Sequence, residues 1–378
     1  MKVLQLSSIN RLTVDSTEII EVRRTARAHG GTAMEPSTRS ERVSQTAAWA
    51  LAAALGLAAL PSAARAEGKL SGVVFADYFY NAQGSGVVEH DQAFQFRRIY
   101  FTHDTDLDAK FSTRFQLEAD QKELTSNGKI GVFVKQAFLK WKDFMPKGAL
   151  LAGLSPTPLW GTTEAVWGYR SLEKTSLDLR GLGSATDLGV ALQGKLGAGE
   201  QVGYHLMFAN GAGQKPESDR SKKAYAGFPI RLGAAVIEPV ADFEGGPGDR
   251  DRWTAKLLVG WQKDPGAIGA EAIRRVNLNA GAGGADVVPT GVSVFGRAKL
   301  AGRCTALARY DWFDPDAEVK GSGDRQHLVI AGVDFAAAEN VHVIPNALVT
   351  VYSAKDAATA DRDTDVVLRV TLVYTWKP

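Results

Sequence analysis

Strict alternation of apolar and polar side chains is the feature that most constrains how this chain can fold. Residues 109–120 read AKFSTRFQLEAD, with Phe111 and Phe115 on one face and Arg114 and Glu118 on the other. Three later segments repeat the pattern, at residues 253–262, 303–312 and 366–376. Because successive side chains of a strand point to opposite faces, a period of two predicts β-strands with one apolar and one charged face.

Two further features favour a transmembrane β-barrel over a soluble β-sandwich. Trp253 and Trp261 share one face and lie about 26 Å apart at roughly 3.3 Å per residue, which spans an apolar band of roughly 20 Å when the strand is tilted by about 40°. The connections also alternate between short and long, as turns and external loops of such barrels do. The short ones are 104–108, 197–200, 263–266 and 301–302, and the long ones are 81–92, 157–183, 211–220, 278–289 and 314–323. A secreted soluble β-protein remains the alternative fold.

Counting the alternating segments predicts an all-β fold, an antiparallel transmembrane barrel of about sixteen strands. Pro229 and Pro239 interrupt residues 221–242, so fourteen or eighteen strands are the alternatives. A barrel of this width leaves an aqueous channel. The predicted strands are 70–80, 93–103, 109–120, 129–142, 149–155, 184–196, 201–210, 221–230, 232–242, 252–262, 267–277, 290–300, 303–313, 324–335, 340–353 and 363–376.

The N-terminal part resembles an export signal. Residues 47–60 form an apolar run that is shorter than the roughly 20 residues of a membrane-spanning helix. Arginines precede this run and a small-residue segment that ends at Ala66 follows it, as in a cleaved signal peptide. We therefore expect a signal peptide over 34–66, a mature barrel over 67–378, and a start at Met34, with residues 1–33 as an upstream extension. A buried core helix is the alternative for the apolar run.

Composition excludes several other classes. Six histidines and a single cysteine, Cys304, argue against a metal centre or a disulfide framework. A formal net charge of +2 argues against a basic nucleic-acid surface. Without residues 1–66 the balance is 36 Lys and Arg against 37 Asp and Glu, a net charge of −1. We expect no cofactor, metal or nucleic acid as a partner.

The charged faces of the predicted strands are the candidate functional surface. Fixed charges that line a pore decide which ions enter it, although the same set could simply keep the interior wet. Arg97 and Arg98 are adjacent, so only one of them is expected to face the lumen. The residues predicted to line the pore are Lys110, Arg114, Glu118, Asp120, Lys256, Arg303, Arg309, Asp311 and Arg369.

The chain resembles the phosphate-selective porin O and P family of bacterial outer-membrane porins. The segments that carry the resemblance are FRRIYF (96–101), KFSTRFQLEAD (110–120), LLAGLSPTPLW (150–160), ATDLGVALQGKL (185–196), YHLMFANGAG (204–213), LARYDWFDPD (307–316) and NVHVIPNALVTVYS (340–353). The resemblance implies a sixteen-stranded homotrimer in the outer membrane, a lipid environment, and small hydrophilic solutes or ions as passengers. It also implies that the third external loop, here residues 156–183, folds inward to narrow the pore.

The charges of that loop do not match a strongly anion-selective constriction. Family members are described as using rings of arginine and lysine, whereas the basic and acidic residues of this loop balance. These residues are Glu164, Arg170, Glu173, Lys174, Asp178 and Arg180. Trp160, Trp167 and Tyr169 of the same loop either form an aromatic track for sugars or pack against the barrel wall.

An outer-membrane barrel hydrolase and a non-conducting structural barrel are the alternative functions. A hydrolase requires a nucleophile, a base and an orienting group in contact. The sequence contains no HExxH or GxSxG signature. The glycine clusters at 281–286 and 321–326 lie in predicted loops and lack the strand-to-helix context of a phosphate-binding site. We therefore expect a channel and no enzymatic activity.

Overall fold

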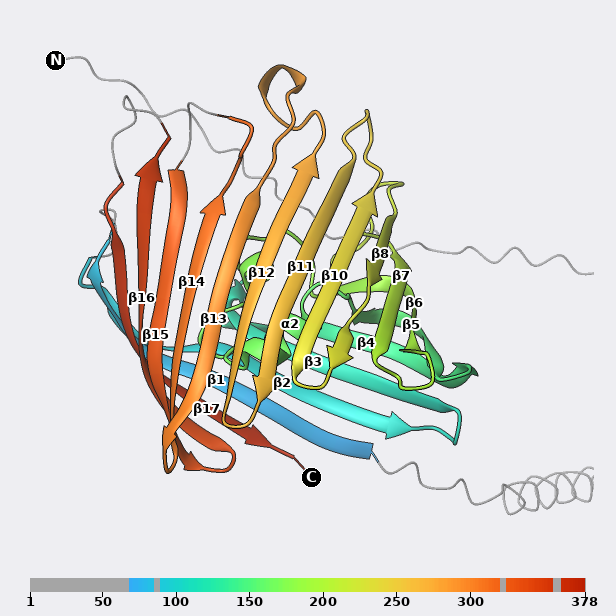
Figure 1. Ribbon diagram of the computed structural model, residues 1–378, viewed down its shortest axis with the longest axis horizontal. Coiled ribbons are helices and arrows are strands. Elements are labelled where there is room, and N and C mark those ends of the chain that lie inside the picture. The colour runs from blue at the N-terminus through green and yellow to red at the C-terminus, as the bar shows by residue number, and fades with distance from the viewer. Residues whose placement is uncertain (1–67, 85–88, 320–323, 356–361, 378) are drawn as a thin grey trace, which may run out of the picture. The chain divides into compact units, whose positions relative to one another are not determined.

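The structure of this chain, a computed structural model, describes residues 68–84, 89–319, 324–355 and 362–377. The expected signal peptide over 34–66, its cleavage after Ala66 and the extension over 1–33 lie outside these residues. Figure 1 shows the strands, which are β1 (Gly68–Gln83), β2 (Gln92–Asp106), β3 (Phe111–Leu124), β4 (Ile130–Met145), β5 (Gly148–Pro156), β6 (Thr186–Leu196), β7 (Val202–Ala209), β8 (Lys223–Gly227), β9 (Ile230–Leu232), β10 (Ala235–Glu244), β11 (Arg252–Lys263), β12 (Gly266–Asn277), β13 (Thr290–Ala301), β14 (Cys304–Asp314), β15 (Asp324–Ala338), β16 (Val341–Ala354) and β17 (Asp365–Trp376).

The strands close into an antiparallel barrel of sixteen strand positions. Each strand position pairs with its neighbours in sequence, and β17 pairs with β1 from Gly72–Trp376 to Gln83–Val366. Both β8 and β9 lie between β7 and β10, so together they fill one position. Pro229 separates them because proline has no N–H to donate to the ladder. The predicted fold class and the count of sixteen are confirmed.

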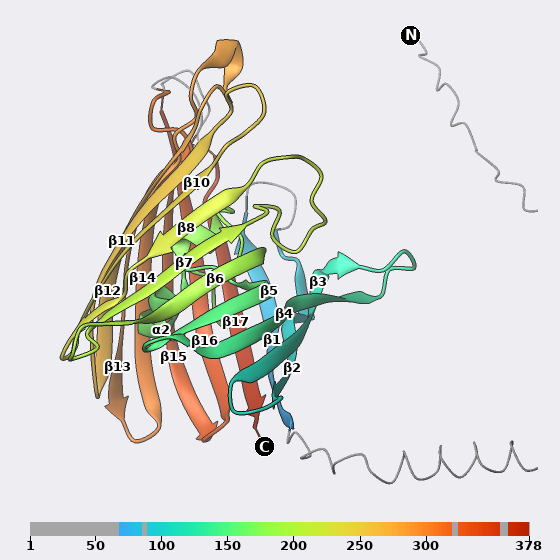
Figure 2. The same cartoon turned by 90° about the vertical axis from the view of Figure 1, so that its right-hand side faces the viewer.

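Short turns and long connections alternate around the barrel. The turns after β4, β9 and β11 span only 146–147, 233–234 and 264–265, whereas the connections after β5 and β12 span 157–185 and 278–289. Figures 1 and 2 show the short turns and the C-terminal end of β17 at one end of the barrel. No helix in the described part of the chain is long and apolar enough to cross a membrane.

Burial alternates along the strands and identifies the two faces of the wall. In β11, Leu257 and Val259 are 46% and 50% exposed, whereas Lys256 and Leu258 on the opposite face are 3% and 0% exposed. The apolar side chains therefore cover the outside and the charged ones face the interior. Trp253 and Trp261 are on the outside at the two ends of β11, where aromatic residues border an apolar band.

Two predicted pore-lining residues lie in turns. Asp108 accepts the backbone N–H groups of Lys110 and Phe111 at 2.7 Å, so the chain is still turning at Lys110 and β3 begins one residue later. Gly302, with φ of +55°, and Arg303 form the β13–β14 turn, and β14 begins at Cys304. Lys110 and Arg303 are exposed there, so the predicted strand starts at 109 and 303 were too early.

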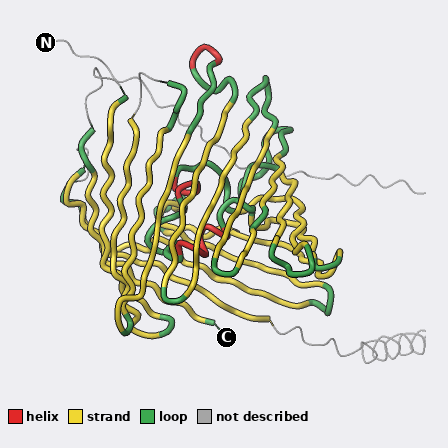
Figure 3. Tube along the Cα trace, in the orientation of Figure 1, coloured by secondary structure: helices red, strands yellow, loops and turns green. Residues whose placement is uncertain are grey.

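The connection between β5 and β6 carries two short helices, α2 (Gly161–Trp167) and α3 (Ser176–Leu179). We call residues 157–185 the β5–β6 segment. Figure 3 shows these helices within the outline of the strands, and α2 keeps that place in the turned view of Figure 2. The segment also supplies much of the molecule's apolar core, because Leu159, Leu172 and Leu177 are each 0% exposed.

Candidate functional site

Three arginines from different strands hold the tip of the β5–β6 segment by its backbone. Arg97 of β2 donates to the Ser171 carbonyl at 2.7 Å, and Arg369 of β17 donates to the Leu172 carbonyl at 2.9 Å. Arg309 of β14 donates to the carbonyl of Lys174. Carbonyl groups that bind charged donors are fixed more strongly than those that bind neutral ones. The three strands therefore hold residues 171–174 against the inner side of the barrel wall.

A buried lysine fixes the start of the same segment. Lys256 of β11 donates to the Leu159 carbonyl at 2.7 Å and lies 2.8 Å from Glu238 of β10. Thr163 of α2 donates to Glu271 of β12 at 2.8 Å. A buried charge is tolerated only when it is paired and hydrogen-bonded, and Lys256 meets that condition. The segment is thus attached at both its start and its tip.

The apolar side of the segment packs on the wall. Trp160, which is 5% exposed, joins a cluster with Leu177, Met207 and Phe313, and Trp167, which is 1% exposed, joins a second cluster with Phe295. The indole rings of Trp160 and Trp167 are covered, so they offer no face on which a sugar can stack. The aromatic-track hypothesis for these two residues is wrong, and the packing alternative describes them.

Tyr169 uses its hydroxyl to reach the opposite wall. It donates to Asp334 of β15 at 3.0 Å, and its ring packs edge-on against Trp167 at 5.8 Å between centroids. Burial, followed by the nearby carboxylate of Asp334, raises the pKa of the Tyr169 hydroxyl, so this group stays protonated and remains a donor.

Most charges of the β5–β6 segment are paired. Arg170 lies 2.7 Å from Glu164 and 3.3 Å from Asp178, and Lys174 lies 3.4 Å from Asp178. Glu173 lies 4.0 Å from Arg97 on the wall. Arg180 donates to Gln326, and its guanidinium lies 5.0 Å from the centre of the Phe313 ring. The six charged residues therefore present little unbalanced field to a passing ion.

The two glutamates of the segment have opposite pKa shifts. Burial raises the pKa of Glu164, and the neighbouring Arg170 offsets only part of that effect. Burial also opposes ionisation of Glu173, but Arg97 and Arg369 outweigh it and lower the pKa of Glu173. Desolvation and opposite charges act on both groups, but the nearby Asp178 also raises the pKa of Glu164, whereas the Lys174 backbone N–H and Arg309 further lower that of Glu173.

A β-bulge turns both Arg97 and Arg98 toward the interior, which corrects the expectation that only one would face it. Phe75 pairs with Arg98 and Ala76 pairs with Phe96, so Arg97 is an extra residue on β2. Arg97 lies 3.4 Å from Asp77 and Arg98 pairs with Glu118. An inserted residue shifts the phase of a strand, so two neighbours can share a face.

The remaining predicted residues form ion pairs along the wall. Arg114 binds Asp104 of β2 through two bonds of 2.7 and 2.9 Å. Glu118 also pairs with Lys135 at 3.0 Å. The other contacts are Arg98–Asp120 at 3.5 Å, Arg309–Asp311 at 2.8 Å and Arg369–Asp77 at 3.8 Å. The structure thus joins the predicted charges to partners on the same strand, on neighbouring strands and on the β5–β6 segment.

Several members of this charged lining were missed from the sequence. Asp77, Glu238 and Glu271 occupy the interior face of strands that read as mostly apolar, so alternation gave little signal for them. Lys135 lies at a second irregularity, where the pairing of β3 with β4 shifts between Gln116 and Leu117. A bulge moves the side chains that follow it to the other face of the strand, and the order of apolar residues in the sequence does not show where it occurs.

This architecture is that of the outer-membrane porins. No protein-family model matches the chain, and no curated protein matches it. Among solved structures, the outer membrane channel DcaP of Acinetobacter baumannii shares 13% identity with a TM-score of 0.62, covering 84% of this chain and 99% of that one. The anion-selective porin from Comamonas acidovorans shares 11% identity with a TM-score of 0.58, covering 82% and 100%. OmpF of Salmonella typhi shares 11% with a TM-score of 0.59, covering 82% and 98%. At these identities the likeness shows the fold.

Proposed function

We propose that this chain is a bacterial outer-membrane porin through which small hydrophilic solutes and ions diffuse passively. The observation that carries the proposal is the closed barrel with an apolar outer face and a charged interior. In a membrane such a barrel encloses water, and solutes move down their own gradients without a cofactor or an energy source. The chain reaches the outer membrane after export and loss of residues 34–66.

The β5–β6 segment is the constriction of this channel. Its attachment to β2, β14 and β17 through carbonyl groups supports this role, because those contacts hold it against the inner side of the barrel wall. The solute path then runs past Glu164, Arg170, Glu173, Lys174 and the wall arginines Arg97 and Arg98. Because these charges are mostly paired with one another, we infer a modest ion preference. The resemblance to phosphate-selective porins extends this inference to anions such as phosphate, and it also implies a homotrimer.

Recording from planar bilayers tests the proposal directly. Residues 67–378 are refolded, folding is checked by heat-modifiable gel migration, and single-channel conductance and the reversal potential in a salt gradient are measured. Steady open channels with a small reversal potential are the expected result. A large reversal potential of anionic sign that phosphate saturates would replace modest selectivity with phosphate selectivity. Folded protein without conductance would overturn the channel and favour a structural barrel or a hydrolase.

A further inference from the structure

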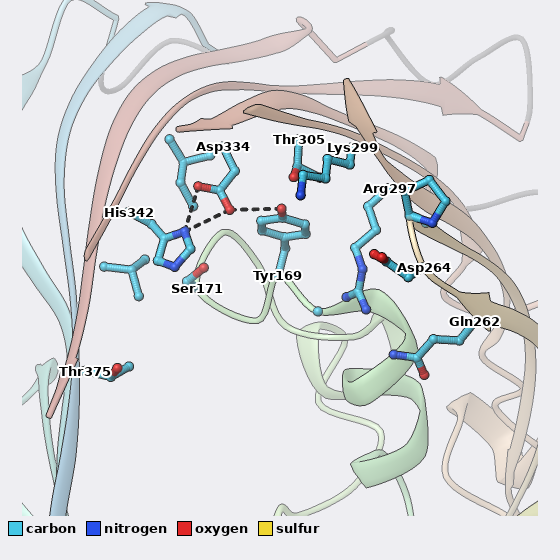
Figure 4. A pocket seen from close by; sticks show the side chains of 15 residues that line it. Tyr169, Ser171, Gln262, Asp264, Arg297, Lys299, Thr305, Asp334, His342 and Thr375 are labelled. Atoms are coloured by element: carbon cyan, nitrogen blue, oxygen red, sulfur yellow. Dashed lines mark hydrogen bonds and ion pairs between the residues drawn. The ribbon is translucent and has the colours of Figure 1, made fainter. Parts of the chain in front are cut away.

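A recess of about 540 Å³ lies between the β5–β6 segment and the wall at the short-turn end of the barrel. Figure 4 shows its lining, to which the segment contributes Tyr169 and the wall contributes side chains of β13 to β17. The volume suits a small organic molecule. None of the functional roles above uses this recess.

The acidic group on one side of the recess already has its donors. Asp334 accepts the Tyr169 hydroxyl at 3.0 Å, and Nδ1 of His342 lies 2.9 and 3.0 Å from its two oxygens. Figure 4 shows these three side chains together on one side. With both oxygens occupied, Asp334 is not available as a partner for a cation across the recess.

Two cations on the other side have no partner. Arg297 and Lys299 project from the same face of β13, and within the described residues neither side chain forms an ion pair or a hydrogen bond. Asp264 is the other acid that lines the recess, and it forms no ion pair with either of them. The recess is lined by two acids and two cations, but the two cations lie together on the β13 side, apart from any ion-pair partner among the described residues.

The guanidinium of Arg297 lies close to the backbone of the segment. Gly168 ends α2 with φ of +75°, and a Cβ on it would lie 1.5 Å from Nη1 of Arg297. The guanidinium therefore rests directly on Gly168, where no carboxylate reaches it. A guanidinium without an anionic partner keeps its donors free to bind a planar oxyanion through two hydrogen bonds.

We propose that this recess is a binding subsite for a small organic monoanion, with its carboxylate on Arg297 and Lys299 and its apolar body against Ile344 and Val373. The proposal rests on the proposed channel only for access, because the recess borders the β11–β12 turn and is reached from the short-turn end. The site would give the proposed channel a preference for anions at a place away from the constriction. The constriction itself gives little such preference, because its charges are paired.

Calorimetric titration of the refolded barrel with 3-phenylpropionate tests the site without requiring conductance. We expect saturable binding of 3-phenylpropionate and none of the neutral 3-phenylpropanamide. Arg297→Gln should weaken the binding at least tenfold. Lys140→Gln is the matched control, because Lys140 lines a separate recess on the β1–β6 wall and also forms no ion pair within the described residues. It removes the same charge and should change the affinity less than twofold.

Bilayer recordings separate this site from the channel itself. The anion should reduce the open-channel current more when it is added at the short-turn side, and Arg297→Gln should abolish the difference. If the channels open and Arg297→Gln and Lys140→Gln weaken anion binding equally, the subsite is overturned and the porin function stands. Equal loss would mean that the anion responds to the overall positive charge of the lumen and not to Arg297. Equal binding of the amide would also overturn it. Calorimetric binding without conductance would support the subsite and overturn the channel.

Discussion

Two lysines that the alternating pattern predicts to line the pore differ in burial. Lys256 is 3% exposed and lies 2.8 Å from Glu238 and 3.9 Å from Glu271, whereas Lys110 lies exposed in a turn. Removing one partner of a buried ion pair leaves an uncompensated charge and costs about 3–5 kcal/mol. We expect Lys256→Met to lower the free energy of unfolding by about that amount, measured by denaturant titration in lipid vesicles.

Lys110→Met is the control for this prediction, and its effect should stay within about 0.5 kcal/mol, as for other exposed substitutions. Adding Glu238→Gln and Glu271→Gln to Lys256→Met should recover part of the loss, because the buried acids are then neutral. Equal effects of the two single lysine variants would show that the buried cluster does not stabilise the barrel.

Glu173 and Glu164 should affect the pH dependence of stability with opposite signs. The pKa of Glu173 is lowered in the fold, so it stabilises the protein above its unfolded pKa, and this contribution is lost as the pH falls through the folded value. The pKa of Glu164 is raised, so its contribution becomes more favourable as the pH falls through the raised value toward the unfolded one.

Denaturant titrations between neutral and acidic pH measure this difference. Glu173→Gln should be less stable than the natural protein at neutral pH, and the gap should close on acidification. For Glu164→Gln the stability relative to the natural protein should fall on acidification. Parallel pH profiles for the two variants would contradict the opposite shifts.

The bulge of β2 predicts which side chains of this strand are accessible from the lumen. In a regular strand only one of Arg97 and Arg98 could face the lumen, but here both contact interior groups. Cysteines at positions 97 and 98, introduced after Cys304→Ser, should both react with a charged, membrane-impermeant thiol reagent and change the single-channel current. Phe96→Cys is the control on the outer face, where lipid should exclude the reagent. Reaction at only one of positions 97 and 98 would contradict the bulge.

The elements themselves were predictable because each strand carries its own two-residue period. All sixteen predicted strands are present, and the turn at 233–234 divides 221–242 into two strand positions, whereas Pro239 lies within β10. The register of single residues was less predictable. The bulge at Arg97 and the turn residues Lys110 and Arg303 depend on pairing partners and on capping by Asp108, which the apolar pattern does not encode.

The interior contacts were the least predictable feature of the whole molecule. The sequence identified residues 156–183 as a loop with balanced charges, and the structure pairs most of those charges. However, the arginines that bind carbonyl groups at 171–174 come from β2, β14 and β17, which are far apart in the chain. Such contacts follow from barrel closure and are not visible in any local window of the sequence.

The outer surface of the whole barrel gives the final prediction. Leu257 lies on the outer face of β11 midway between Trp253 and Trp261, so it should sit near the centre of the membrane. A cationic side chain there destabilises a transmembrane barrel by about 2–4 kcal/mol, and near the membrane surface by about 0–1 kcal/mol. We expect Leu257→Arg to fold poorly into lipid vesicles, as measured by heat-modifiable gel migration and denaturant titration.

Leu232→Arg is the matched control, because Leu232 is also exposed but borders the short turn at 233–234 and should lie at the membrane surface. It should fold nearly as well as the natural protein. The two variants introduce the same arginine at outer-face leucines of similar exposure. If the apolar surface faces lipid, the loss of stability should therefore be larger at the membrane centre than at the membrane surface. Equal tolerance of arginine at both positions would mean that the apolar surface of the barrel does not face lipid.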